Sequence, residues 1–487
     1  MAGERIEKFS QTYRIYLDRR MPQIFLLGLI QGFPWVLIGS ALSLWLKEEG
    51  FSRSDIGLFG LVFSVYSVNF LWAPLMDRLR IPLLTRFFGQ RRAWVLTMQL
   101  IIFGSMVGMF FVNPQAELFW VAFFAFLIAL ASATQDISLD ALRIDLIGKS
   151  ESVKLTGAAA LMVAGWWTAA KLGGAAALYL AGYYQQLGLA DSWQLVYVTL
   201  TAFVILGNIL LAVMVRDSLD KTRFAAQSSY DEKYRALLID KGIAHQRLNK
   251  MLTWLLGTIV APLASFFRNN GVWIGISILG FIMLFKMGEA FLGRMSILFY
   301  TEIGFSKEEI AQYSKILGWV TTLFFSLAGG LINARFGLLR SIFISGIAMA
   351  ATNLLFALMA FTGPEPWVFI TAVVMDDFTS AVSTVTFVAF ISQLCDRTFT
   401  ATQYALMASL GTFARNTIAS FSGFAVDGIE KWVLAHNLTF VGAGAENTAW
   451  ALFFLLTTLM VIPSLLLLWF IAKRLGEIFY QANTRVL

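Results

Sequence analysis

Twelve stretches of about 20 predominantly apolar residues recur along this chain, and no other feature of the sequence limits its fold as strongly. A helix of that length crosses the roughly 30 Å of hydrocarbon in a bilayer. Because a segment in lipid must satisfy its own backbone hydrogen bonds, each stretch is predicted to be helical. The stretches are 23–46, 55–76, 93–112, 117–140, 155–181, 195–215, 272–299, 308–332, 338–361, 366–394, 399–425 and 449–472. The predicted fold class is an all-α polytopic membrane protein with twelve transmembrane helices.

Composition narrows the function as well as the fold. With 58% hydrophobic residues among 487, the chain holds more apolar side chain than a soluble core can hide, so a lipid bilayer is its expected partner. The one cysteine, Cys395, excludes an intrachain disulfide, and the two histidines, His245 and His436, fall in polar connections. Neither a zinc site nor a Ser-His-Asp triad can be assembled within the membrane from these residues. We therefore predict a protein that is not an enzyme and that holds no metal or cofactor.

The positive charges indicate how the helices are oriented. The N-terminal segment, every second connection and the C-terminal tail hold 28 of the 37 Lys and Arg residues, and the opposite connections hold Lys47, Arg53, Lys307, Lys315 and Lys431. Positive residues gather on the cytoplasmic side of membrane proteins, so both termini are predicted to be cytoplasmic. The net charge of +7 follows from this bias. Since the cations are spread over short connections, they do not indicate nucleic-acid binding.

One long polar connection, 216–271, divides the chain into two units of six predicted helices each, 1–215 and 272–487. Within this connection, residues 231–260 combine frequent Lys and Arg with leucines on one side. That pattern is typical of a helix lying on a membrane surface. We predict such a helix on the cytoplasmic face, where it tethers the two units, and not a thirteenth span.

The two units resemble copies of each other. The segment "ALMVAGWWTAAK" (160–171) aligns with "ALMASLGTFAR" (405–415), which places Lys171 and Arg415 at matching positions to within one residue. Parallel six-helix repeats of this kind describe the major facilitator architecture. In that architecture helices 1, 4, 7 and 10 line a central cavity, which the fold resemblance alone implies.

Charged residues interrupt three of these cavity helices. They are Asp136 and Asp140 in the fourth predicted helix, Lys286 and Glu289 in the seventh, and Asp376 and Asp377 in the tenth. A charge at mid-bilayer costs between ~2.5 and more than 10 kcal/mol, so such residues usually face a partner or an aqueous cavity. We predict that Asp136, Asp140 and Glu289 are candidates for proton coupling. The candidates for binding an anionic substrate are Lys286, Asp376, Asp377, Lys171 and Arg415.

Each of these assignments has a structural alternative. Asp136 and Asp140 could instead be paired with Lys286 or with Arg143, one helical turn beyond Asp140. Lys286 and Glu289, three residues apart, could neutralise each other. The adjacent Asp376 and Asp377 cannot both face the cavity squarely. A further group near the cytoplasmic ends is predicted to act in gating, with Arg143 and Asp145 as an ion pair that clamps the inward gate: Asp77, Arg91, Arg92, Arg143 and Asp145.

Aromatic residues near the cavity helices add a second class of candidate. Gln31 and Trp35 in the first predicted helix complete the substrate-binding set. Several aromatic side chains could stack on sugar rings, although in a chain with 15 Trp and 44 Phe most such residues are packing residues: Trp35, Tyr66, Trp72, Trp166 and Trp167.

Four strings also resemble a known family. They are "FLWAPLMDR" (70–78), "SATQDISLDALRIDL" (132–146), "FFRNNGVWIGISILGFIMLFKMGEAF" (266–291) and "FTATQYALM" (399–407). Each looks like the corresponding segment of the AmpG-type anhydromuropeptide permeases of bacteria, in a match that runs roughly through 23–215 and 262–425. In two places the sequence departs from the family, with a longer connection between the units and extra residues before Gly89.

The resemblance implies import of N-acetylglucosaminyl-1,6-anhydro-N-acetylmuramic acid and its peptide-bearing forms, driven by protons, across the bacterial inner membrane for peptidoglycan recycling. It places Asp136, Asp140, Lys286 and Glu289 where the family has its intramembrane charges. The expected partners are therefore an amino-sugar or peptide substrate, protons and lipid, with the protein a monomer. Because eukaryotic acetyl-CoA transporters resemble the same family, another anionic solute such as acetyl-CoA is the alternative. A non-transporting scaffold would have no reason to place charges on three cavity helices. An enzyme would need a nucleophile-base pair or metal ligands, which the histidine and cysteine counts disfavour.

Overall fold

The computed structural model of this chain describes residues 14–51, 53–147, 151–189, 191–216, 221–240, 246–310, 313, 317–439 and 444–484. Throughout these ranges the chain forms helices joined by short connections, and they hold no β-strand. The prediction of an all-α protein is confirmed.

The helices before residue 217 form the group that we call the N-bundle. They are α2 (Met21–Val36), α3 (Leu42–Glu48), α4 (Arg53–Phe59), α5 (Val65–Val68), α6 (Ala73–Arg78), α7 (Leu84–Phe88), α8 (Gln90–Phe110), α9 (Pro114–Leu146), α10 (Ser152–Gln186) and α11 (Ser192–Met214). A π-turn over Leu37–Ala41 joins α2 to α3. Short 3-10 turns over Gly60–Ser64 and Asn69–Leu71 separate α4, α5 and α6, so the second predicted span is a chain of short helices.

The helices from Val272 onward form the C-bundle. They are α15 (Val272–Phe285), α16 (Met287–Glu302), α17 (Lys307–Ile310), α18 (Leu317–Phe336), α19 (Leu338–Thr362), α20 (Pro366–Leu394), α21 (Thr400–Thr417), α22 (Ser422–Ala435), α23 (Ala445–Leu459) and α24 (Ile462–Thr484). The seventh predicted span is divided at Lys286, between α15 and α16. A 3-10 turn over Ile418–Phe421 likewise separates α21 from α22.

Ten helices within the described ranges are long and apolar enough to cross a membrane. Nine fall on predicted windows, and the tenth, Arg247–Asn270, lies in the polar connection. Windows 55–76 and 399–425 have no such helix because their helices are interrupted. Window 155–181 has none although α10 is continuous.

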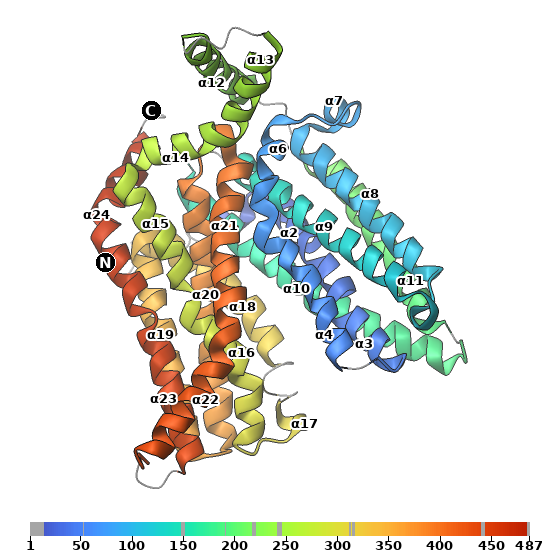
Figure 1. Cartoon of the computed structure of the whole chain (residues 1–487), viewed down its shortest axis with the longest axis vertical. Coiled ribbons are helices and arrows are strands. Elements are labelled where there is room, and N and C mark those ends of the chain that lie inside the picture. Colours follow the sequence, from blue (N-terminus) through green and yellow to red (C-terminus); the bar gives the residue numbers. More distant parts are fainter. Residues whose placement is uncertain are drawn as a thin grey trace.

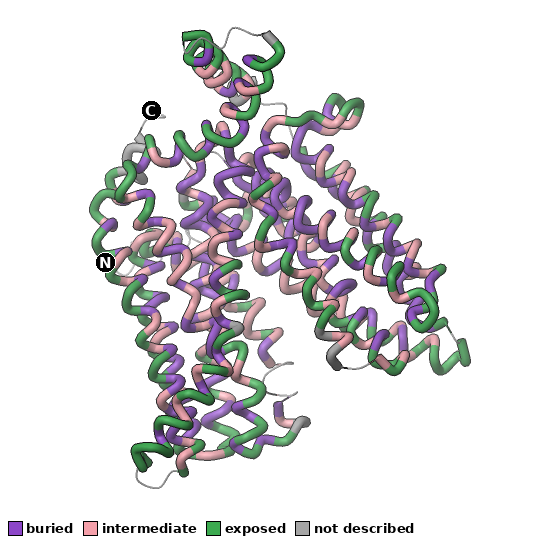
Figure 2. Tube along the Cα trace, viewed as in Figure 1, coloured by how far each residue is buried: buried purple, intermediate pink, exposed green. Residues whose placement is uncertain are grey.

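The two bundles lie side by side and are joined at one end. Figure 1 shows them meeting near the short helices α6 and α14 and diverging toward α3 and α17, with α12 (Lys221–Asp240) and α13 (Gln246–Leu255) projecting beyond the joined end. We call this the α12 end. Figure 2 shows that buried residues concentrate along the helices that face each other, whereas α12 and α13 are largely exposed.

Close packing of α2 on α10 fixes the interior of the N-bundle. A Cβ atom on Gly28 would collide with the Met162 carbonyl, and one on Gly32 with the Trp166 carbonyl. In the opposite direction, a Cβ on Gly165 would collide with the Phe25 carbonyl. Small residues spaced in this way let two helix backbones approach closely in a membrane. The crossing therefore sets the position of the side chains next to these glycines.

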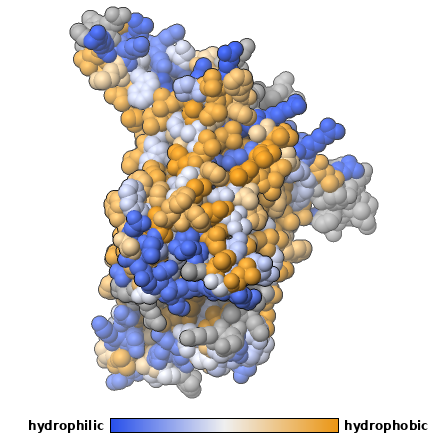
Figure 3. Space-filling view, turned by 90° about the vertical axis from the view of Figure 1, so that its right-hand side faces the viewer, coloured by the Kyte–Doolittle hydropathy of each residue, from blue (hydrophilic) through white to orange (hydrophobic). Residues whose placement is uncertain are grey.

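The polar connection holds α12, α13 and α14 (Ala261–Asn270). Of the helix predicted over 231–260, residues 231–240 lie in α12 and 246–255 in α13, and residues 241–245 lie outside the described part of the chain. In Figure 1, α14 runs across the end of the C-bundle and not along its helices. Of the apolar side predicted for this segment, Leu248, Trp254 and Leu255 are exposed on α13, whereas Leu238 of α12 is buried. Figure 3 shows a broad apolar surface on the bundles, with hydrophilic regions toward the ends.

Candidate functional site

Two helices are interrupted near the middle of their spans, and both interruptions carry candidate residues. In the N-bundle, Pro34 and Trp35 lie in the last turn of α2, just before the π-turn over Leu37–Ala41. In the C-bundle, Lys286 leaves the helical conformation, with φ −99° and ψ 7°, between α15 and α16. Irregular backbone at membrane depth is tolerated where it is buried in protein or lines a cavity, and it often marks a binding site.

The carboxylates of α9 share a partner from α2. The Gln31 amide donates to Asp140 Oδ2 at 3.1 Å, and Gln31 also lies close to Asp136. Arg143 forms an ion pair with Asp140, at 3.2 Å, and its own side chain is fully buried. Asp136 Oδ1 is buried without a hydrogen-bond partner among the described residues. Of the two carboxylates, Asp140 is therefore held in a charged network and Asp136 is incompletely satisfied.

The ammonium group of Lys286, in the broken seventh span, is surrounded by acceptors. Lys286 Nζ donates to Glu289 Oε2 at 2.5 Å, to Ser383 Oγ at 2.7 Å and to Thr384 Oγ1 at 2.9 Å. Ser380 Oγ in turn donates to Glu289 Oε1 at 2.8 Å. The three donors of the ammonium are thus used in this conformation. The self-neutralising pair that was one alternative for Lys286 and Glu289 is present.

The adjacent carboxylates of α20 have different surroundings. Asp377 accepts a hydrogen bond from Thr321 Oγ1 of α18 at 2.6 Å. Asp376 Oδ1 is buried without a partner within the described residues. Of the matched cations, Lys171 lies 5.4 Å from the Trp167 ring and within electrostatic range of Asp377 in the other bundle. Arg415 is exposed on α21, within electrostatic range of the Lys286 and Glu289 pair.

Aromatic rings gather around Trp35. Its ring centroid lies 4.7 Å from that of Phe63, 5.0 Å from Tyr66 and 5.4 Å from Trp166. The close crossing of α2 and α10 brings Trp35 and Trp166 together, because Trp166 directly follows Gly165 and Trp35 lies three residues after Gly32. Trp72, by contrast, donates through its indole to Thr134 Oγ1 at 3.0 Å.

At the α12 end, Asp77 joins the two bundles. Its Oδ1 accepts from Arg91 at 2.7 Å, and both side chains are almost fully buried. Its Oδ2 accepts from the backbone N–H and the hydroxyl of Thr402, at 2.8 and 2.6 Å, and the Ala401 N–H lies 3.3 Å from Oδ1. These donors form the first turn of α21. A carboxylate there satisfies free N–H groups and interacts favourably with the positive end of the helix dipole.

A reciprocal contact runs from the C-bundle to α9. Arg397 donates to the carbonyls of Ile144 and Ile147 at the C-terminal end of α9, where the helix dipole is negative. Asp145 lies 3.4 Å from Arg91 and 3.7 Å from Arg397, and it accepts from the Thr400 hydroxyl at 3.2 Å. We call Asp77, Arg91, Asp145, Arg397 and Thr402 the interbundle network.

The other two gating candidates lie beside this network. Arg143 contacts the C-bundle directly, because it donates to Ser392 Oγ of α20 at 2.9 Å. It pairs with Asp140 and not with Asp145, so the predicted clamp is divided between two separate ion pairs. Arg92 donates to the Ala212 carbonyl of α11.

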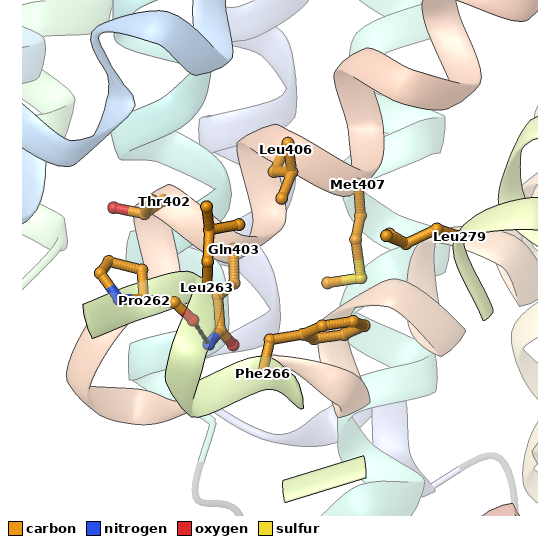
Figure 4. A pocket seen from close by; sticks show the side chains of 8 residues that line it. All are labelled: Pro262, Leu263, Phe266, Leu279, Thr402, Gln403, Leu406 and Met407. Atoms are coloured by element: carbon orange, nitrogen blue, oxygen red, sulfur yellow. Dashed lines mark hydrogen bonds between the residues drawn. The ribbon is translucent and has the colours of Figure 1, made fainter. Parts of the chain in front are cut away.

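A small apolar pocket adjoins the interbundle network. Figure 4 shows Phe266 of α14 and Leu279 of α15 facing Met407 of α21, and the Gln403 amide donating to the Pro262 carbonyl at 2.9 Å. Its lining holds no charged side chain. This pocket is therefore distinct from the charged groups at mid-span.

The profile of the Major Facilitator Superfamily matches residues 24–416. The chain belongs to the major facilitator superfamily. Two relatives within this superfamily narrow the assignment. The anhydromuropeptide permease of Escherichia coli strain K12 is 30% identical over 465 residues, which cover 94% of this chain and 81% of that one. A protein of Rickettsia felis named putative transporter AmpG 4 is 28% identical over 465 residues, covering 95% of this chain and 99% of that one.

These matches confirm the resemblance to AmpG-type permeases, and they indicate a transporter and not an enzyme. Solved structures agree on the fold. A structure of the symporter XylE superimposes with a TM-score of 0.61 at 15% identity, covering 94% of this chain and 95% of that one. The human organic anion transporter MFSD10 superimposes with a TM-score of 0.54 at 16% identity, covering 91% and 99%.

Several uncharged residues also join the two bundles, and the sequence did not predict them. Asn69 bridges the bundles, because its amide donates to the Ala133 carbonyl at 3.2 Å and its oxygen accepts from Ser409 of α21 at 2.6 Å. Gln227 of α12 donates to the carbonyls of Asp77 and Thr398, which belong to different bundles. Such residues are common on any helix, and only their position between the bundles distinguishes them.

Proposed function

We propose that this permease imports N-acetylglucosaminyl-1,6-anhydro-N-acetylmuramic acid and its peptide-bearing forms by proton symport across a bacterial inner membrane. The observation that carries the proposal is the 30% identity to an anhydromuropeptide permease over most of the chain. The charges around the two broken helices support it, because a muropeptide is anionic and the site offers cations beside carboxylates.

Proton symport has an electrostatic reason. Moving one negative charge inward against a potential of 100 mV, negative inside, costs about 2.3 kcal/mol. A proton that travels with the anion offsets this cost. Asp136 is the first candidate to carry it, because its Oδ1 is unpaired among the described groups whereas Asp140 is bound by Gln31 and Arg143. Asp140 is the reserve candidate.

We propose that Glu289 controls whether Lys286 is available to the substrate. Lys286 is occupied by Glu289 at 2.5 Å and by two hydroxyls. A proton on Glu289 removes the charge that holds the ammonium, so a substrate carboxylate can take its place. Arg415, with its bidentate guanidinium, and Lys171 complete the cationic side. Asp376, Asp377, Gln31 and Trp35 form the remaining polar and aromatic contacts of this proposed site.

The proposed gate is the interbundle network together with Arg143 and Arg92. In this conformation the network joins the bundles at the α12 end, which we assign to the cytoplasm together with both termini. The proposed functional units are 1–215 and 272–487, which rock about the central site, and 216–271, which tethers them. We propose that a monomer is sufficient, because both units belong to one chain.

The test is uptake of radiolabelled anhydro-disaccharide into membrane vesicles of a strain that lacks its own permease. With an imposed proton gradient directed inward, so that the outside is acidic, the protein should accumulate the disaccharide. An uncoupler should abolish this accumulation. Competition by unlabelled acetyl-CoA decides between the two anionic substrates. Uptake that acetyl-CoA blocks and unlabelled disaccharide does not would replace the muropeptide assignment.

A further inference from the structure

Three polar atoms on and beside Tyr66 in the N-bundle lack a hydrogen bond. Trp35 Nε1, Tyr66 Oη and Asp136 Oδ1 are buried without a hydrogen bond among the described residues, and Ser132 Oγ, near Tyr66, is likewise unpaired there. The Trp35 and Tyr66 rings are 5.0 Å apart, and Tyr66 lies within electrostatic range of Asp136. Buried polar groups are nearly always satisfied in folded proteins, so three together require an explanation. Two are donors and one is an acceptor.

Four aromatic rings pack on one another at the same place. The ring centroids of Phe63, Tyr66 and Trp166 lie 4.7 to 5.4 Å from that of Trp35. Binding sites combine mainly apolar and aromatic lining with a few placed polar groups. A pyranose ring matches this combination, because its C–H face packs on an aromatic ring while its edge carries hydroxyls and oxygens that donate and accept.

The backbone around this cluster is built to hold it. Trp35 lies two residues before the start of the π-turn over Leu37–Ala41, and such turns occur frequently at functional sites. On the other side, Trp166 follows Gly165 at the tight α2–α10 crossing. Both aromatic walls therefore stand on backbone that is fixed by packing, which favours precise placement of a ligand.

We propose that Trp35, Phe63, Tyr66 and Trp166 form a saccharide subsite that takes one pyranose ring of the substrate. Trp35 Nε1 and Tyr66 Oη donate to sugar oxygens, and Asp136 Oδ1 accepts from a sugar hydroxyl. The rings pack on one another in this conformation, so the sugar enters by separating Trp35 from its neighbours. The inference rests on the proposed function and divides the substrate between the bundles, with the sugar in the N-bundle and the carboxylate beside Arg415 in the C-bundle.

Binding titrations on the purified full-length protein test this division. The ligands are the anhydro-disaccharide with its free lactyl carboxylate and the same molecule with that carboxylate converted to an amide. Trp35→Ala should weaken both ligands at least tenfold, which equals about 1.4 kcal/mol, and Tyr66→Phe at least threefold. Arg415→Ala should weaken the acid and leave the amide unchanged.

Matched controls are available among the exposed aromatic side chains. Trp273 is 81% exposed and Tyr179 is 75% exposed, so Trp273→Ala and Tyr179→Phe should bind both ligands within twofold of the parent. Tyr66→Phe removes a single oxygen atom and keeps the test valid if Trp35→Ala does not fold. If the parent binds both ligands and the Trp35 and Tyr66 variants match their controls, the subsite is wrong and the proposed function stands. If the parent binds neither ligand, the proposed substrate and its sugar subsite both fall.

Discussion

Replacing Asp77 with asparagine should open the α12 end of this permease. Asparagine keeps the shape of the side chain but loses its charge and one of two acceptor oxygens. The buried Arg91 keeps an ion pair with Asp145 at 3.4 Å, and the N–H and hydroxyl of Thr402 on the first turn of α21 lose the oxygen that accepted from them. The substitution acts on contacts between the bundles, so it destabilises the joined conformation in particular.

The magnitude follows from the contacts that cross between the bundles. Asp77 Oδ2 accepts from the N–H and the hydroxyl of Thr402, and a hydrogen bond to a charged group contributes about 1.5–3 kcal/mol. Asparagine carries an NH2 group in place of that oxygen, so both bonds are lost, and the lower figure for each gives about 3 kcal/mol together. In an opened conformation water solvates these groups, so the cost falls on the joined state. A shift of about 3 kcal/mol changes the ratio of open to joined molecules roughly 100-fold, at 1.4 kcal/mol per factor of ten.

A single buried cysteine reports this shift. Ala405 is 3% exposed and packs in a cluster with Ala73 and Met76 of the N-bundle, so Ala405→Cys in a Cys395→Ser background should react with a bulky maleimide when the bundles part. Asp77→Asn should raise the labelling rate toward that 100-fold limit. The control is Glu477→Gln, which breaks an exposed pair worth about 0–1 kcal/mol. Labelling of the Asp77 variant within twofold of the parent would refute the reasoning.

Three further results are expected. Asp136→Asn should abolish gradient-driven accumulation at equal expression, because an amide cannot bind and release a proton, and unchanged uptake would remove this residue from proton coupling. Lys286→Ala and Arg415→Ala should each raise the Kd for the anhydro-disaccharide about tenfold, as measured by titration of purified protein, since each removes one charge-assisted contact of about 1.5 kcal/mol. Lys250→Cys in a Cys395→Ser background should be labelled by an impermeant maleimide from the cytoplasmic side, and labelling from outside would overturn the topology.

The sequence was informative where the membrane imposes a cost. Apolar windows located most helices because a span needs about 20 such residues, and charged residues stood out because burying a charge in lipid is costly. The breaks at Leu37–Ala41 and Lys286 were not predicted. A π-turn changes how backbone hydrogen bonds are paired without changing the hydropathy of a window, so no compositional signal marks it.

Partners across the bundles were equally hidden. The sequence placed Arg143 near Asp140 because a helix brings residues three apart together, and this pair is present at 3.2 Å. Its second partner, Ser392, is 249 positions away, on α20. Polar uncharged residues such as Ser392, Asn69 and Gln227 are frequent on helices, and only the packing of one bundle on the other reveals their role.

The placement of the interbundle network explains how a gate can be both strong and reversible. Asp77 binds the N-terminal end of α21 and Arg397 binds the C-terminal end of α9, so each bundle supplies a charge to a helix end of the other. Free N–H and carbonyl groups of helix ends and charged side chains are all well solvated by water. Because the network lies at an end of the bundles, parting them exchanges these contacts for water, and the two conformations can differ by few kcal/mol. A gate built from the mid-span pair of Lys286 and Glu289 would leave each charge in a medium of low polarity, where separation costs much more.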